Sequence, residues 1–199
     1  ALATHQALLE ATRENEREAL VARLREQEER MRFMAQHDAL TGLPNRYSMQ
    51  ERLSLALELA KRNRKHVALM LVDLNDFKAV NDTRGHAAGD QVLIAVANRL
   101  RSSVRGSDTV ARIGGDEFVV LAGELDRTED ASFIAEKIVD MVGLPLSIDG
   151  SMEKVACSIG ISIFPDDAES PESLIERADR AMYVAKAAQQ KRFAFFSAQ

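Results

Sequence analysis

The chain has 199 residues, of which 46% are hydrophobic and 29% are charged, and its formal net charge is −5. This composition is typical of globular proteins, and the acidic balance argues against a uniformly basic nucleic-acid-binding protein. The single cysteine excludes a disulfide framework and a cysteine-rich zinc site. No apolar run approaches the ~20 residues of a membrane span, and the first residue is Ala1. We therefore expect a cytoplasmic fragment of a longer protein, whose full-length form is either soluble or membrane-attached.

Residues 1–36 differ in composition from the rest of the chain. They contain no Gly and no Pro and are rich in Ala, Leu, Glu and Arg, which is typical of a long exposed helix. An apolar seam runs along this segment, although Gln27 and Glu28 interrupt its heptad register. The seam consists of Leu20, Leu24, Met31 and Met34. The helix is either simply solvated or pairs with a second copy, and we favour pairing because so thin a seam orders little by itself.

The remaining residues, 37–199, carry the signals of a globular domain. Turn residues over 41–45 precede a helical pattern, and the apolar run 67–72, which ends at Asp73, predicts a central strand buried on both faces. The elements predicted after it are a helix over 92–104, short strands at 109–113 and 117–121 around a Gly-Gly turn, a helix over 134–142, a hairpin at 149–150, a strand at 155–163, a helix over 174–185 and an edge strand at 193–196.

From residue 67 to residue 163 the predicted order is strand, helix, strand, strand, helix, strand. This is the split βαβ arrangement of ferredoxin-like α+β folds. It predicts an antiparallel sheet with helices on one face, to which further flanking helices are added here. In this topology the first strand and the second hairpin strand lie at the centre. The end of strand 67–72 and the turn at 114–117 are therefore expected side by side.

Three carboxylates stand at this expected meeting point. Asp73 ends the buried strand, and Asp116 and Glu117 follow the Gly-Gly turn. Carboxylates that converge from adjacent strands suit Mg²⁺, which prefers oxygen ligands and keeps waters or substrate phosphates. If only the positions of these acids in the sequence are considered, solvated side chains at strand ends and turns are a simpler interpretation than a magnesium site. Neither a P-loop nor a Gly-x-Gly-x-x-Gly turn is present to indicate another nucleotide site.

Four motifs occur together in a fixed order. They are HDALTGLPNR at residues 37–46, DLNDFK at 73–78 followed by ND at 81–82 and by GHAAGD at 85–90, RIGGDEF at 112–118, and the helix from Ala178-Asp179 to Lys186. These motifs resemble, respectively, the opening motif, the substrate loop, the signature and the last helix of GGDEF domains, the diguanylate cyclases of bacteria. The resemblance extends from residue 37 to about residue 190. It makes a metal site a better interpretation of the three carboxylates than simple solvation.

The resemblance implies a reaction and a metal site. GGDEF enzymes condense two GTP into cyclic di-GMP and release two pyrophosphates, on a fold related to nucleotide cyclases and polymerase palm domains. Asp73 and Glu117 would hold Mg²⁺ (or Mn²⁺) with the backbone carbonyl of Leu74, and Asp116 would serve as a metal ligand or general base.

The resemblance also implies how GTP is bound. Gly114 and Gly115 would let the nucleotide approach the backbone, because neither carries a Cβ. The other implied substrate residues are Asn81 and Asp90 for guanine, and Phe77, Lys78 and Lys186 for the β- and γ-phosphates. A carboxylate can accept from guanine N1–H and N2–H₂, which adenine lacks. Phe77 is equally suited to be a core residue, so two interpretations stay open for it.

Two further features concern regulation and affinity. Arg105 and Asp108 form an Arg-x-x-Asp pattern shortly before the signature, and it resembles the inhibitory product site of the family. Gln190 stands where the last helix of the family usually continues to a phosphate-binding Arg. The triphosphate would therefore lack one charge-assisted contact there, unless Lys191 or Arg192 compensates.

We therefore predict a GGDEF catalytic domain at residues 37–199. The helix at residues 1–36 would control how two such domains meet. The protein would act as a homodimer of GTP-loaded domains, be inhibited by cyclic di-GMP, and bind no nucleic acid polymer. An upstream sensor domain is expected outside this sequence. The alternatives are a catalytically silent domain that acts as a receptor for cyclic di-GMP or GTP, a structural dimerisation domain, and a mononucleotide cyclase. The intact Asp116 and Glu117 argue against the first of these.

Overall fold

The computed structural model of the protein describes residues 2–188 and 192–197. The chain divides into two units, residues 1–37 and residues 38–199. The first unit consists of helix α1 (Leu2–Gln36), in which the predicted seam residues Leu20, Leu24, Met31 and Met34 are each more than half exposed. Among the described residues, no helix is both long enough and apolar enough to cross a bilayer.

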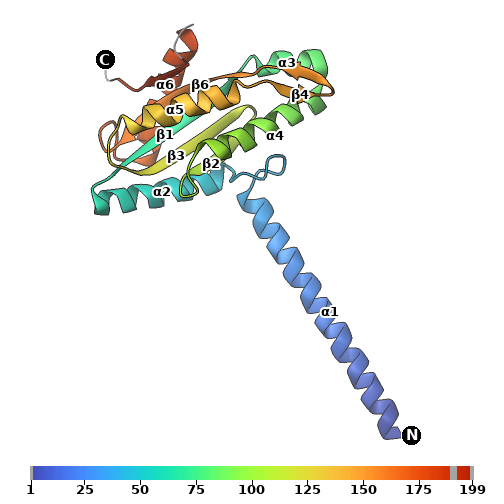
Figure 1. Cartoon of the computed structure of the whole chain (residues 1–199). Helices are drawn as coiled ribbons and strands as arrows, with labels where there is room; N and C mark the ends of the chain where they lie inside the picture. The colour runs from blue at the N-terminus through green and yellow to red at the C-terminus, as the bar shows by residue number, and fades with distance from the viewer. Residues whose placement is uncertain (1, 189–191, 198–199) are drawn as a thin grey trace. The chain divides into compact units, whose positions relative to one another are not determined.

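The second unit is built on a five-stranded sheet with the order β2-β3-β1-β6-β7 (Figure 1). Strand β1 (His66–Asn75) lies between β3 (Glu117–Leu125) and β6 (Ala156–Phe164) and is antiparallel to both. β2 (Thr109–Gly114) pairs with the outer side of β3, and the short edge strand β7 (Phe193–Phe195) pairs in parallel with β6. This order confirms the predicted ferredoxin-like α+β core with an added edge strand.

Helices cover both faces of this sheet: the core helices lie on one face, as predicted, and the flanking helices, which the sequence assigned to no face, cover the other. The two helices of the ferredoxin-like core, α4 (His86–Ser103) and α5 (Asp130–Val142), pack on one face. The flanking helices α2 (Arg46–Asn63) and α6 (Pro171–Ala187) pack on the other. The central strand explains why: Met70 and Val72 join the cluster under α4 and α5, and Leu69 and Leu71 join the cluster under α2 and α6. A strand that is apolar on both faces needs a cover on each.

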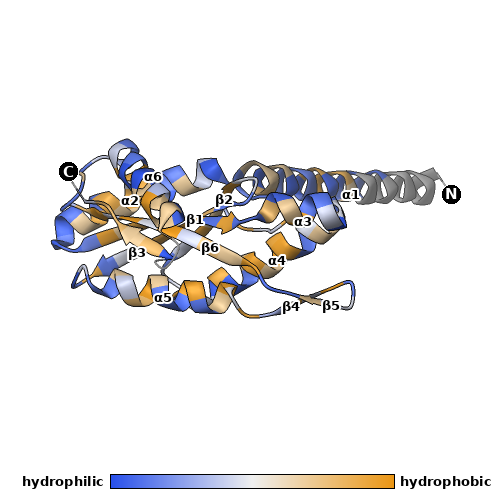
Figure 2. Cartoon of the chain, turned by 90° about the horizontal axis from the view of Figure 1, so that it is seen from above, coloured by the Kyte–Doolittle hydropathy of each residue, from blue (hydrophilic) through white to orange (hydrophobic). Residues whose placement is uncertain are grey.

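The hydropathy colouring follows this arrangement. In Figure 2 the inner strands β3 and β6 carry the hydrophobic colour and lie between helices whose outer turns are hydrophilic. The hairpin predicted at 149–150 is a separate two-stranded sheet of β4 (Leu146–Ile148) and β5 (Ser151–Glu153).

One helix was not predicted from the sequence. Residues expected to form a polar loop after β1 fold into the short helix α3 (Phe77–Arg84), and Gly85, with a φ of +84°, separates it from α4. Phe77 is the buried residue of α3, at 8% exposure, so the segment has no repeating apolar face to signal a helix.

Strand β6 and helix α6 pack so closely that one residue of β6 has no room for a side chain. A Cβ added to Gly160 would lie well inside contact distance of the Ala178 carbonyl oxygen and the Met182 backbone nitrogen. Because both obstacles are backbone atoms, we expect Gly160→Ala to lower the free energy of unfolding by about 3 kcal/mol. Urea unfolding measures this. Gly123→Ala, where an added Cβ meets nothing within 4 Å, is the matched control; equal losses in both variants would contradict the close packing.

Candidate active site

The end of β1 and the tip of the β2–β3 hairpin lie side by side. Asp73 on β1 is the Cα partner of Glu117 on β3 and of Ser158 on β6. The backbone N–H of Leu74 donates to the carbonyl oxygen of Asp116, at 3.3 Å. The strand pairing therefore brings together the three carboxylates that the sequence placed at this edge. Asp73 is buried at 8% exposure, and Asp116 and Glu117 are half-buried.

Asp73 has a lysine partner from the last helix. The Nζ atom of Lys186 on α6 lies 2.9 Å from Oδ1 of Asp73. Burial raises the pKa of Asp73, the hydrogen bond and charge of Lys186 oppose this rise, and the nearby charge of Asp116 adds to it, so that the pKa lies above its ordinary value. Asp73 is thus paired with Lys186 and lies near the charge of Asp116, so further positive charge is stabilising beside these acids.

The residues present fit a magnesium ion that is completed by substrate. Within the described residues, no three His, Cys, Asp or Glu side chains are gathered into a ready-made cage. Mg²⁺ is usually held by one or two carboxylates, with phosphate oxygens and waters as its other ligands. A buried Asp73 directly opposite Glu117 offers that partial set.

The turn between β2 and β3 is open to solvent at its two glycines. Gly114 and Gly115 have φ angles of +147° and +51°, and a Cβ built on either meets nothing within 4 Å. Residues with side chains rarely adopt these angles, which explains the need for glycine. The open space leaves the backbone of the turn approachable by a ligand.

Helices α3 and α4 hold the residues expected to bind GTP. Asn81 is half-buried on α3, and Asp90 is exposed on α4. The two helices approach closely because Gly89 lacks a Cβ, which would collide with the side chain of Asn81. Lys78 is exposed, whereas the side chain of Phe77 belongs to the hydrophobic core. Only the backbone N–H of Phe77, at the first residue of α3, is left for a phosphate.

The Arg105 and Asp108 pair closes the turn that leads into β2. The N–H of Arg105 donates to Oδ2 of Asp108, and the N–H of Asp108 donates to the carbonyl oxygen of Arg105, both at 3.0 Å. Arg105 is exposed. The pair lies at the start of β2, and the Gly-Gly turn lies at its end.

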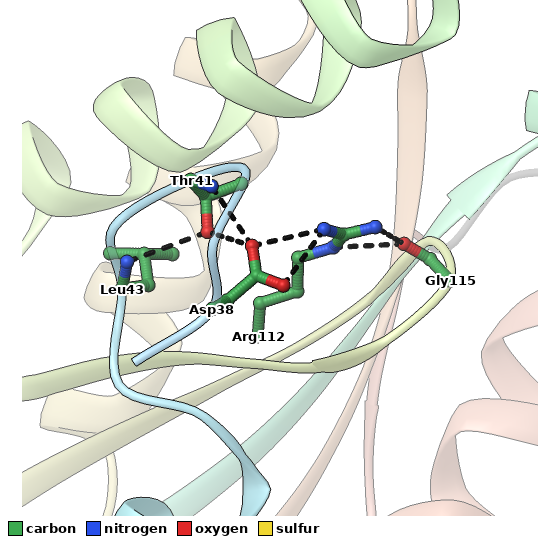
Figure 3. A network of polar contacts seen from close by, with 5 residues as sticks. All are labelled: Asp38, Thr41, Leu43, Arg112 and Gly115. Atoms are coloured by element: carbon green, nitrogen blue, oxygen red, sulfur yellow. Dashed lines mark hydrogen bonds and ion pairs between the residues drawn. The ribbon is translucent and has the colours of Figure 1, made fainter. Parts of the chain in front are cut away.

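Sequence reasoning missed a polar network behind the signature turn. The guanidinium of Arg112 joins the carboxylate of Asp38 to the carbonyl oxygen of Gly115, and Thr41 binds the same carboxylate (Figure 3). In the sequence these residues stand out only as members of two motifs. Arg112 and Asp38 are 74 positions apart, so nothing local in the sequence indicates the pair.

The family model described as "Diguanylate cyclase, GGDEF domain" matches residues 35–192. The chain belongs to the GGDEF domain family. Diguanylate cyclase TpbB of Pseudomonas aeruginosa is 43% identical over 173 residues, which are 86% of this chain and 40% of TpbB. The bifunctional diguanylate cyclase/cyclic di-GMP phosphodiesterase MucR of the same species is 44% identical over 82% of this chain and 24% of its own length. The chain thus spans less than half of these curated relatives.

Solved GGDEF structures agree with the fold. A crystal structure of the GGDEF domain of PA1120 (YfiN or TpbB) from Pseudomonas aeruginosa matches with a TM-score of 0.77 and 42% identity, over 80% of this chain and 99% of that one. The coiled coil and GGDEF domain of DgcB from Caulobacter crescentus, in complex with c-di-GMP, matches with a TM-score of 0.80 and 30% identity, over 92% of this chain and 97% of that one.

One expected departure from the GGDEF pattern lies outside the described residues. Gln190, which stands where the family usually has a phosphate-binding Arg, falls in the segment 189–191. Lys186 and Arg192, on either side of it, are described, and Lys186 already faces the acidic site.

Proposed function

We propose that the chain is the catalytic domain of a diguanylate cyclase, which condenses two GTP into cyclic di-GMP and releases two pyrophosphates. The observation that carries the proposal is the pairing of Glu117 with the buried Asp73 beside the open Gly114-Gly115 turn. The names of the relatives TpbB and MucR support the same reaction class.

The proposed roles follow the geometry. Asp73 and Glu117, with the carbonyl of Leu74, would hold Mg²⁺ (or Mn²⁺), and Asp116 would be a further ligand or a general base. The metal ion supplies charge neutralisation at the triphosphate when it is bound. Asn81 and Asp90 would bind the guanine edge, and Asp90 can accept from its N1–H and N2–H₂ groups. The backbone N–H of Phe77 and the side chains of Lys78 and Lys186 would bind the β- and γ-phosphates.

We further propose that two GTP-loaded domains must face each other. One domain binds one GTP, so a second domain must deliver the other half of the product. The apolar seam of α1 is exposed along the single chain, and pairing with a second copy would cover it. We propose that residues 1–36 form this pairing helix and that residues 37–199 form the catalytic domain. An upstream sensor in the full-length protein, which is cytoplasmic or membrane-attached, would control how two catalytic domains meet.

A receptor function is the second candidate. Similar chains also occur in proteins named for the opposite activity, such as cyclic di-GMP phosphodiesterase NbdA, at 39% identity over 85% of this chain. A GGDEF domain that binds cyclic di-GMP or GTP without turnover would fit such a context. The intact Asp116 and Glu117 favour the enzyme.

Product analysis separates these functions. The protein is incubated with GTP and Mg²⁺, with ATP in a parallel reaction, and the products are identified by mass spectrometry. We expect cyclic di-GMP from GTP, little product from ATP, and a rate that rises more than linearly with protein concentration while dimers are scarce. Nucleotide binding without product would establish the receptor, and a monocyclic nucleotide would establish a mononucleotide cyclase.

Feedback by the product is expected to act through Arg105. Its exposed guanidinium can bind a product phosphate or guanine edge, while Asp108 is held in place by the turn. We expect Arg105→Ala to keep the initial rate within about twofold, and to raise the cyclic di-GMP concentration needed for half-inhibition about tenfold, because a charge-assisted hydrogen bond contributes ~1.5–3 kcal/mol. Initial rates at increasing product concentration measure both. An Arg105→Ala variant inhibited as strongly as wild type would place the inhibitory site elsewhere.

A further inference from the structure

The residue at the centre of the signature turn is held through both of its neighbouring peptide groups. Before Asp116, the carbonyl oxygen of Gly115 accepts from Nε and Nη2 of Arg112, at 3.0 and 2.7 Å. After Asp116, its own carbonyl oxygen accepts from the N–H of Leu74, at 3.3 Å. One anchor is therefore a backbone group of the central strand, and the other is a single side chain.

The Arg112 contact determines how the peptide between Gly115 and Asp116 is turned. A peptide group is planar and trans, so its N–H points opposite to its C=O. Because the Gly115 carbonyl points at Arg112, the N–H of Asp116 points away from Arg112. With the next carbonyl held by Leu74, the backbone of Asp116 has one orientation, and so has the start of its side chain.

The two glycines of the turn cannot replace this contact, although Gly114 also pairs with Glu117 across the hairpin. Gly114 and Gly115 are exposed, have no side chains, and leave open space where a Cβ would stand. Glycines in the left-handed region lose more freedom on folding than other residues and do not hold their own conformation. The two-pronged contact from Arg112 supplies the restraint that side-chain packing provides elsewhere.

Arg112 is itself held by the opening motif. Its Nη1 donates to both carboxylate oxygens of Asp38, at 3.0 and 3.1 Å, and its N–H donates to the carbonyl oxygen of Pro44, at 3.0 Å. Oδ1 of Asp38 also accepts from the N–H and the hydroxyl of Thr41, at 2.9 and 2.7 Å. The side chains of Arg112 and Asp38 are only 12% and 23% exposed.

The Asp38 carboxylate stays charged in this setting. Burial alone would raise the pKa of Asp38, but the hydrogen bonds from Thr41 and Arg112 and the charge of Arg112 outweigh it and lower the pKa. The pair therefore persists throughout the neutral pH range.

We propose that Asp38 and Arg112 are positioning residues for catalysis: Asp38 orients Arg112, and Arg112 fixes the Gly115–Asp116 peptide so that Asp116 faces the bound nucleotide. This rests on the proposed cyclase function. Neither residue touches the reacting atoms, so their loss affects the chemical step more than the binding of GTP. Asp38 acts only through Arg112.

Steady-state kinetics of Arg112→Lys, Asp38→Asn and the double variant test the proposal. Lysine keeps the charge but cannot hold the carbonyl and the carboxylate together. We expect Arg112→Lys to lower kcat about 10- to 100-fold, since a misplacement of about 1 Å costs on that order, with the KM for GTP within about threefold. Asp38→Asn should lower kcat less. The double variant should be no slower than Arg112→Lys alone, because Asp38 acts through Arg112.

Two further measurements separate positioning from mere stability. Hydrogen exchange at the Leu74 amide, which donates to the Asp116 carbonyl oxygen, should be faster in Arg112→Lys, with the melting temperature still well above the assay temperature. Asp126→Asn removes the ion pair with Lys65, beside the opposite end of β1, and serves as the control with unchanged kcat. Unchanged kcat in Arg112→Lys and Asp38→Asn, or additive losses in the double variant, would overturn the positioning role. If the wild-type protein still makes cyclic di-GMP, the proposed function stands in that case. Wild-type protein that makes no product would overturn both.

Discussion

Replacing Glu117 by Gln is expected to reduce the turnover of GTP at least about 100-fold, the loss typical of removing one group that stabilises charge in a reaction site. Glu117 is the Cα partner of the buried Asp73 and completes the carboxylate pair at the end of β1. Glutamine keeps the shape of the side chain and removes its charge. A neutral amide is a weak ligand for Mg²⁺, which binds carboxylates and phosphates.

The fold is expected to survive this change. Glu117 is only half-buried, at the first residue of β3, so an isosteric neutral side chain costs little packing. The matched control is Glu124→Gln, the same chemical change on the same strand, at an exposed position away from the turn. Rates of cyclic di-GMP formation and thermal unfolding are measured on both variants. A Glu117→Gln enzyme with near wild-type rate would remove the metal role of this residue.

Replacing Lys186 by Met is expected to change the affinities for metal and nucleotide in opposite directions. The Lys186 ammonium lies 2.9 Å from Asp73, a residue that we propose as a metal ligand. An ammonium and a divalent cation compete for that carboxylate. Without Lys186 we expect the acidic site to bind Mg²⁺ about tenfold more tightly in the absence of nucleotide, since removing one nearby unit charge changes the binding energy by roughly 1–4 kcal/mol.

GTP binding is expected to weaken in the same variant. The lysine that leaves Asp73 is proposed to hold a phosphate, and a lost charge-assisted contact weakens binding about tenfold. Titration calorimetry with Mg²⁺ alone, and then with a non-reacting GTP analogue, measures the two affinities separately. Lys137→Met, an exposed lysine on α5, is the control. Weaker or unchanged Mg²⁺ binding in Lys186→Met would show that Lys186 does not compete for the metal site.

The order of the strands and core helices and the protein family could be predicted from the sequence. The apolar run that ends at Asp73, the Gly-Gly turn and the alternating strand over 155–163 are local patterns, because strand periodicity and turn chemistry depend on neighbouring residues. Their order predicted the ferredoxin-like core and the meeting of Asp73 with Glu117. The motifs then indicated the GGDEF family, to which the chain belongs.

Other features were decided by the tertiary structure alone. The helix α3 has little apolar periodicity and forms around one buried side chain, that of Phe77. Helices cover both faces of the sheet because β1 is apolar on both faces, and the assignment of α2 and α6 to the second face depends on packing. The Arg112–Asp38 and Lys186–Asp73 contacts join residues far apart in the sequence. A charged side chain has many possible partners in an extended chain, and only the folded sheet brings one of them within hydrogen-bond distance.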